Sequence, residues 1–200
     1  MPHTEISPNI FDCDVCHTRC DGKSKLNYQF KNDVDFAEEQ ERLVIDRSIE
    51  LFGYKATKTE RDGYPDLELR DEKNDLVKYV EVKAQRRTFM SVERLLPQAK
   101  LKPSETLALN LSDLLRYFQI KEEEEIPIYL LWTLSERLCL TEENQFNFYY
   151  QDIDVLKEIY EKYESKRRFR RQSGSGDVVD GVHKGVVVNY HFSLNELIKI

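Results

Sequence analysis

Apolar residues recur at two different periods along this 200-residue chain, and each period predicts one kind of element. At 100° per residue, one sector of residues 35–52 collects Ala37, Val44, Ser48, Leu51 and Phe52, which predicts an amphipathic helix. Glu41 lies inside that sector, and a charged side chain on a core-facing side needs a reason. Leu67–Arg70 and Leu76–Ala84 are instead short strand-like runs joined by a charged turn. We expect them to pair as a hairpin.

The second half of the chain predicts further helices and strands in alternation. Ile126–Leu134 is almost wholly apolar, which is typical of a buried central strand. The other predicted elements are strand 107–110, helix 113–122, strand 146–150, helix 153–163, strand 186–192 and a short terminal helix 194–200. Residues 88–105 stay ambiguous because Pro97 and Pro103 interrupt their pattern. This alternation predicts an α/β fold with a central mixed sheet flanked by helices.

The composition supports a folded core and sets the expected compartment. Hydrophobic residues make up 40% of the chain and aromatic residues 11%, so disorder is not expected. No run approaches the roughly 20 apolar residues of a membrane helix, and the N-terminus lacks a basic stretch followed by an apolar one. We therefore expect a cytoplasmic protein without a membrane segment. Residues 1–32 are predicted to be a cysteine-containing appendage, and residues 33–200 the main domain.

Charge is unevenly distributed. The net charge of −7 argues weakly against nucleic acid, but the basic residues are clustered around Phe169 and beside the predicted hairpin. These basic residues are Lys166, Arg167, Arg168, Arg170 and Arg171 around Phe169, and Arg86 and Arg87 after the hairpin. With the Gly/Ser-rich residues that follow, they predict a flexible basic segment at about 165–181 that contacts nucleic acid. The alternative is a solvated helix end, where cations also favour the dipole.

The hairpin carries the candidate chemistry. Glu81 and Lys83 are two residues apart on one strand, so they share a face, and Gln85 follows on that face. Asp66, just before the preceding strand, can join them if the strands pair. Two carboxylates and an ammonium in one place suit Mg²⁺ or Mn²⁺ binding and phosphodiester cleavage. The Val82 carbonyl is a further metal ligand candidate. The alternative is an ordinary exposed charge face.

The order of these features resembles a known group. A helix with an acidic residue, then Pro65-Asp66, then Glu81-Val82-Lys83 resembles the PD-(D/E)XK nuclease superfamily, over about residues 35–134. It is similar to a bacterial branch whose function is uncharacterised. The resemblance implies a restriction-endonuclease-like αβββαβ core and metal-dependent cleavage of DNA in restriction, repair or junction processing. A homodimer is an expectation from the same resemblance. A member of the fold that only binds is the alternative.

The resemblance also assigns roles to residues. It carries over Asp66, Glu81 and Lys83 as catalytic. With the Val82 carbonyl, which strand geometry allows to face the metal, Asp66 and Glu81 are the expected magnesium ligands. Glu41 is expected to add a carboxylate from the first helix, with Glu38 as the fallback. Gln85 is expected to hydrogen-bond substrate or water.

Three cysteines near the N-terminus form a separate candidate site. Cys13, Cys16 and Cys20 supply three thiolates for tetrahedral Zn²⁺, and the candidates for the fourth ligand are His17, His3 and Cys139. An iron–sulfur cluster and the absence of any metal stay open. The alternative function is a non-catalytic nucleic-acid-binding module with a structural zinc site. A third is a protein-interaction scaffold that docks through the acidic run Glu122–Glu125.

Overall fold

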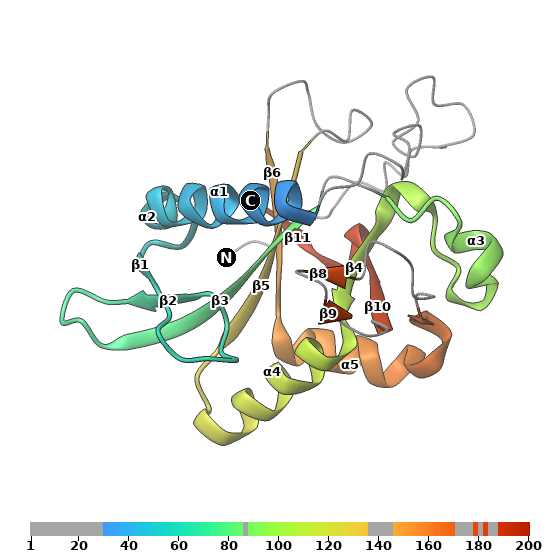
Figure 1. The fold of residues 1–200 in the computed structure, drawn as a ribbon. Coiled ribbons are helices and arrows are strands. Elements are labelled where there is room, and N and C mark those ends of the chain that lie inside the picture. Colours follow the sequence, from blue (N-terminus) through green and yellow to red (C-terminus); the bar gives the residue numbers. More distant parts are fainter. Residues whose placement is uncertain (1–29, 86–87, 136–145, 171–177, 180–181, 184–187) are drawn as a thin grey trace.

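A six-stranded mixed sheet forms the centre of the molecule (Figure 1). The computed structural model describes residues 30–85, 88–135, 146–170, 178–179, 182–183 and 188–200. The strand order is β1-β2-β3-β5-β6-β11. The bounds are β1 Lys55–Lys58, β2 Leu67–Arg70, β3 Leu76–Gln85, β5 Ile128–Leu134, β6 Asn147–Asp152 and β11 Ile198–Lys199. The central pair, β3 and β5, is parallel, and the other neighbours are antiparallel.

Helices cover both faces of this sheet. On one face lie α1 (Phe30–Asp46) and the short α2 (Ser48–Phe52), and Val44 of α1 packs against a cluster with Val80 and Val82. On the other face lie α4 (Leu111–Glu124) and α5 (Ile153–Tyr163), which bury Tyr117, Trp132 and other residues in the larger core cluster (Figure 1). The elements α1, β1, β2, β3, α4 and β5 follow in the order αβββαβ. The predicted fold class is therefore confirmed.

A second, smaller sheet stands beside the first. Its order is β4-β10-β7, from β4 (Thr106–Asn110), β10 (Val188–Ser193) and β7 (Arg168–Arg170). Between the strands of these sheets lie short helices and 3₁₀ turns. Two further strands of two residues each pair with one another. These short elements are α3 (Val92–Leu95), the 3₁₀ turns η4 (Pro97–Ala99), η5 (Pro103–Glu105), η6 (Glu164–Arg167) and η8 (Leu194–Glu196), and the pair β8 (Val178–Val179) with β9 (Val182–His183).

The main sheet and the first helix depart from the predicted elements at three places. Outside them, Arg168–Arg170, predicted as part of a flexible segment, forms strand β7. The first helix is interrupted at Arg47, where the buried Ser48 hydroxyl accepts the backbone N–H of Ala56 on β1. Strand β1 was not predicted, because only Ala56 of its four residues is buried. The predicted terminal helix is wrong: after η8 the chain extends into β11, because Ile198 pairs with Tyr150 of β6. No helix among the described residues is long and apolar enough to cross a membrane.

Candidate active site

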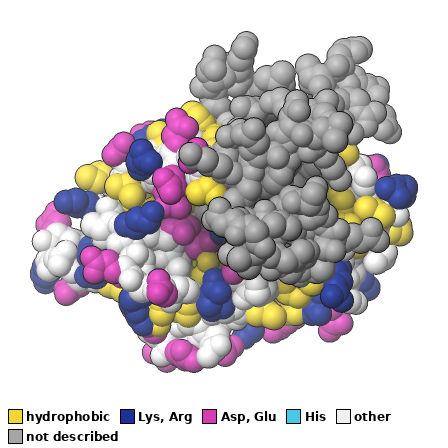
Figure 2. Space-filling view, viewed as in Figure 1, with side chains coloured by type: hydrophobic (Ala, Val, Ile, Leu, Met, Phe, Trp, Pro, Cys, Tyr) yellow, Lys and Arg dark blue, Asp and Glu magenta, His cyan; other side chains and the backbone are white. Residues whose placement is uncertain are grey.

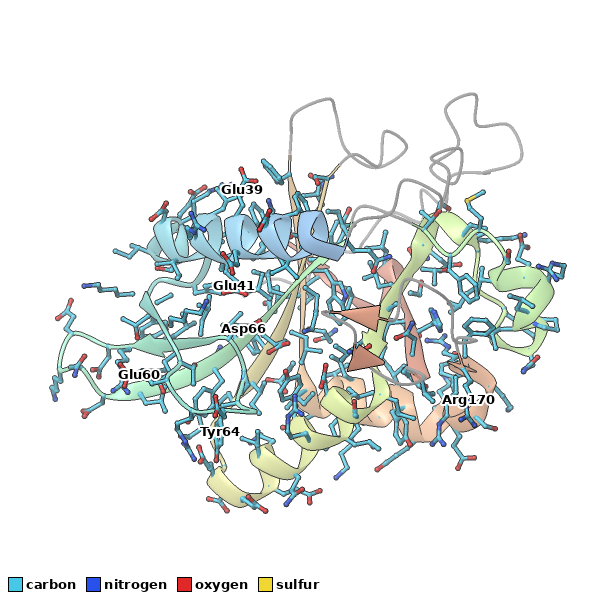
Figure 3. The ribbon with its side chains drawn as sticks, in the orientation of Figure 1. Glu39, Glu41, Glu60, Tyr64, Asp66 and Arg170 are labelled. Atoms are coloured by element: carbon cyan, nitrogen blue, oxygen red, sulfur yellow. The ribbon has the colours of Figure 1, made fainter. Side chains whose placement is uncertain are left out.

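Asp66 and Glu81 meet where β3 runs past the start of β2. Leu67, the first residue of β2, pairs with Val80, so Asp66 lies opposite Glu81. The Asp66 N–H donates to Glu81 Oε2 at 3.2 Å, and Asp66 Oδ2 accepts the backbone N–H of Val82 at 2.8 Å. Because β2 begins at Leu67, its backbone does not pair with β3 at Val82. The carboxylate of Asp66 bonds to β3 there instead. Figure 3 shows this aspartate at the middle of the sheet, below α1.

Glu81 is a buried carboxylate with several polar partners. It is 2% exposed, and Lys83 forms an ion pair with its Oε1. The phenol of Tyr117 on α4 lies beside it, and the charge of Glu81 contributes to the raised pKa of that phenol. A charged group taken out of water is costly unless such partners compensate it. The same-face spacing expected of Glu81 and Lys83 is therefore realised as a direct contact within β3.

The two carboxylates of Asp66 and Glu81 outnumber the single ammonium of Lys83, and this excess is seen in the pKa of Asp66. Burial, and then the neighbouring Glu81, raise the pKa of the Asp66 carboxyl to about 7. Lys83 and the Val82 N–H act in the opposite direction but do not prevail. For Lys83, burial lowers the pKa, but Glu81 and Asp66 outweigh it and leave its pKa raised. The site therefore holds a firmly protonated lysine beside two carboxylates, one of which retains a proton near neutral pH.

Helix α4 adds residues that the sequence reasoning missed. Burial raises the pKa of the Tyr117 phenol, and the charge of Glu81 raises it further, so the hydroxyl stays protonated and can donate to Glu81. Arg116 donates to Asp113 at 2.8 Å, and the charge of Asp113 contributes to the raised pKa of Lys83. The only signal in the sequence was a tyrosine among the apolar positions of a predicted helix, which is compatible with an ordinary core residue.

Glu41 reaches toward the site from α1, as the helical phase predicted. Its side chain is 17% exposed and forms an ion pair with Lys58 of β1, with Lys58 Nζ at 2.8 Å from Glu41 Oε2. Its charge contributes to the raised pKa of Asp66. Figure 3 shows Glu41 between the helix and Asp66. Glu38, the fallback, is more exposed and pairs with Arg42 at 3.4 Å.

Gln85 lies at the end of β3 and bonds to the second sheet. Its Nε2 donates to the carbonyl of Thr106, and its Oε1 accepts the N–H of Ala108, each at 3.0 Å. Both ends of the amide therefore join β3 to β4. A contact with substrate or water stays a prediction for this residue.

The basic segment is folded into the protein for part of its length. Arg167 is 3% exposed and donates to Glu196 at 2.7 Å. Arg168 donates to the Tyr160 hydroxyl, and the ring of Phe169 packs against Phe89 at a centroid distance of 4.9 Å. We no longer expect Arg167 and Phe169 to contact nucleic acid, because Arg167 is bonded to Glu196 and Phe169 is packed against Phe89.

The other basic residues keep their prediction. Lys166 and Arg170 are exposed, so a nucleic-acid contact stays a prediction for them. Several predicted residues lie outside the described residues: Arg86, Arg87 and Arg171, and the candidate zinc ligands Cys13, Cys16, Cys20 and His17.

The donor set at Asp66 suits a hard divalent cation. Within the described residues, no group of three or more His, Cys, Asp and Glu side chains is arranged to hold a metal ion. Asp66 and Glu81 supply two carboxylates, however, and Mg²⁺ uses one or two of these and keeps several waters. The N–H and C=O of a strand residue point to the same side, so the Val82 carbonyl faces Asp66 as its N–H does. Figure 2 shows acidic side chains gathered in the middle of this face, beside Lys and Arg.

Comparison with known proteins gives little beyond this geometry. No family model matches the chain, and no curated protein matches it. Among solved structures it is similar to Hjc, a Holliday junction resolvase from the archaeal hyperthermophile Archaeoglobus fulgidus. The identity is 8% and the TM-score 0.38, over 77% of this chain and 80% of that chain. A likeness at this level carries no argument about the site, whose interpretation rests on its own residues.

Proposed function

We propose that the chain is a divalent-metal-dependent endonuclease that hydrolyses DNA phosphodiester bonds. One observation carries the proposal: the carboxylates of Asp66 and Glu81 meet beside the Lys83 ammonium at the edge of β3. This is the convergence that the spacing of residues predicted. The resemblance of Pro65-Asp66 and Glu81-Val82-Lys83 to the PD-(D/E)XK pattern supports the same conclusion.

Asp66, Glu81 and the carbonyl of Val82 would hold the cation, which is Mg²⁺ or Mn²⁺. When bound, such a cation neutralises charge on the phosphate and provides a hydroxide-like water near neutral pH. Asp66 has to release its proton to become a ligand, and its pKa of about 7 places that release near neutral pH. The raised pKa of Asp66 fits this role, because a cation would relieve the repulsion between the two carboxylates.

Lys83 supplies a fixed positive charge at the same place. Because its pKa is raised, it stays an ammonium at neutral pH. It can therefore hold a phosphate oxygen or orient the attacking water without giving up its proton in the resting state. The Asp66 N–H donates to Glu81 and the Tyr117 phenol lies beside it, so the oxygens of this carboxylate keep one orientation. A cut through both DNA strands requires two such sites, so we also propose a homodimer as the working unit.

Cleavage of plasmid and of four-way-junction DNA tests the proposal. Wild type is expected to cut in Mg²⁺ or Mn²⁺ and to stop when EDTA is added. Asp66→Ala and Lys83→Ala are each expected to lose about 1,000-fold in single-turnover rate, because a cation or charge contact contributes several kcal/mol in the transition state. Asp62→Ala is the matched control, since Asp62 is an exposed aspartate in the same loop. Cleavage that survives both site substitutions would falsify the assignment.

A further inference from the structure

Glu124, on the last turn of α4, binds three side chains from two other segments. Its Oε1 accepts Arg61 Nη2 and the Tyr64 hydroxyl, each at 2.7 Å, and its Oε2 accepts the Tyr79 hydroxyl at 2.9 Å. One alternative from the sequence is that Glu124 belongs to an acidic docking run, Glu122–Glu125. Its side chain is only 21% exposed, and both of its oxygens accept hydrogen bonds from other side chains.

The three partners also hold one another. Arg61 Nη1 donates to the Tyr79 hydroxyl at 3.0 Å, and the guanidinium lies over the Tyr64 ring at 3.4 Å from its centroid. The two tyrosine rings contact each other at a centroid distance of 5.7 Å. We name this network of Arg61, Tyr64, Tyr79 and Glu124 the glutamate clamp. Its bonds to a charged acceptor are of the stronger kind.

The two tyrosines of the glutamate clamp lie two residues before the two carboxylates of the candidate site. Tyr64 precedes Asp66 by two residues, and Tyr79 precedes Glu81 by two residues on β3. The loop between β1 and β2 closes through the Thr59 N–H, which donates to the Asp66 carbonyl at 2.9 Å. Figure 3 shows Tyr64 below Asp66, toward α4. The clamp therefore fixes the loop that delivers Asp66 to the edge of β3.

One helix thus contacts both parts of the site. At its middle, α4 places the Tyr117 hydroxyl beside Glu81, and at its end it places Glu124 on the residues before Asp66 and Glu81. Gly63, whose φ of 79° favours glycine, lies between Arg61 and Tyr64 and brings the loop against the Arg116 side chain. Without the clamp, residues 59–66 would be a surface loop tied mainly by its ends.

We propose that Glu124 is a positioning residue: through Arg61 and Tyr64 it holds the loop 59–66 so that Asp66 lies beside Glu81, and the affinity of the site for its cation depends on it. The inference rests on the proposed function, because it assumes that Asp66 and Glu81 share a cation. Partners of metal ligands typically change metal affinity or activity by about 10- to 100-fold when they are lost.

Calorimetric titration of the full chain with Mn²⁺ tests this inference. Glu124→Ala is expected to raise the Mn²⁺ dissociation constant by about 10-fold or more. Glu124→Gln retains an acceptor for Arg61 and Tyr64 and is expected to stay within about 3-fold of wild type. Glu123→Ala is the matched control, because Glu123 is the preceding glutamate and bonds only Gln119 among the contacts described. Its affinity is expected to be unchanged.

Hydrogen exchange of the segment 59–66 gives a second reading on the same proteins. It is expected to speed up in Glu124→Ala and to remain at the wild-type rate in Glu123→Ala. Should Glu124→Ala fail to fold, Tyr64→Phe replaces it, since that change removes one of the two side-chain bonds from the loop to Glu124 and leaves that of Arg61. About 3-fold weaker Mn²⁺ binding is then expected.

The outcomes separate this inference from the proposed function. If wild type binds no Mn²⁺, the metal site itself is wrong and the inference falls with it. If wild type binds Mn²⁺ and folded Glu124→Ala binds it within about 2-fold of wild type, only the inference is overturned. A lower melting temperature with unchanged affinity would show that the clamp is merely structural.

Discussion

Two ion pairs among the described residues each have one nearly buried member, and they differ in how their charges are balanced. Glu81 and Lys83 pair on β3, while Arg167 and Glu196 join η6 to η8. The side chain of Glu81 is 2% exposed and that of Arg167 is 4% exposed. Both cations are matched to a carboxylate, so burial alone does not distinguish a functional pair from a structural one.

The difference lies in what surrounds each pair. Asp66 adds a second carboxylate beside Glu81, and its pKa rises to about 7 as a result of burial and that neighbour. Around Arg167 the partners complete the structure instead: Glu196 Oε2 also accepts the Ser193 N–H in a capping box, and His191 bonds the Arg167 carbonyl. Burial lowers the pKa of His191 to about 4, so this neighbour is uncharged at neutral pH. An excess of negative charge is what the proposed cation site requires, whereas a balanced pair serves the structure.

Breaking the balanced pair should affect stability and spare the chemistry. Arg167→Ala is expected to lower the free energy of unfolding by about 3 kcal/mol, because Glu196 loses its buried partner. Chemical denaturation measures this change. The cleavage rate per folded molecule should stay within about 2-fold of wild type, since the pair lies apart from Asp66 and Glu81.

The neighbouring lysine provides the control for this change. Lys166 is exposed, so Lys166→Ala should change the free energy of unfolding by no more than about 0.5 kcal/mol. Equal losses in the two variants would show that the Arg167 pair is not the structural element described here.

Relieving the excess charge should have the opposite sign. The folded-state pKa of Asp66 is raised from its ordinary 3.8 to about 7, so the stability it contributes is present at low pH and lost as pH rises through about 7. In EDTA, Asp66→Asn should therefore be more stable than wild type at about pH 8, by on the order of 2 kcal/mol relative to the difference at about pH 5. Thermal melts of both proteins at the two pH values measure this.

A metal titration checks the same explanation from the other side. Mn²⁺ at about pH 8 should stabilise wild type and leave Asp66→Asn nearly unchanged, because only wild type regains a compensated carboxylate pair. A pH-independent difference between the two proteins would contradict the raised pKa of Asp66.

The two regions also show what the sequence could predict. The contact of Glu81 with Lys83 follows from strand period alone, because two residues apart on one strand means one face. The placement of Asp66 follows once the strands pair. Nothing comparable governs Arg167 and Phe169, since a run of basic residues without a period does not say which side chains point inward. Their burial depends on Glu196 and Phe89, which lie far away in sequence.

The roles of Tyr117 and Glu124 on α4 could not be predicted from the sequence for a similar reason. The helix itself was predicted from its pattern, but the partners of Tyr117 and Glu124 are set by how the helix crosses the sheet. Strand β1 escaped prediction because an edge strand buries little, and Ala56 is its one buried residue. Local period therefore predicts the residues that share an element, and the tertiary fold decides the contacts between elements.

Removing a single hydroxyl beside Glu81 should have a weaker effect than the changes above. Tyr117→Phe removes this hydroxyl but leaves Lys83 and the Asp66 N–H in place. Single-turnover cleavage in saturating Mn²⁺ should fall by about 10-fold, because Glu81, the proposed cation ligand, loses a neighbouring hydroxyl that helps to orient it. The free energy of unfolding should fall by no more than about 1 kcal/mol. Tyr160→Phe is the control, since its hydroxyl accepts Arg168 instead of contacting the site. If both variants cut at the wild-type rate, the Tyr117 hydroxyl does not contribute to cleavage. The residues of the hairpin alone would then set the state of Glu81.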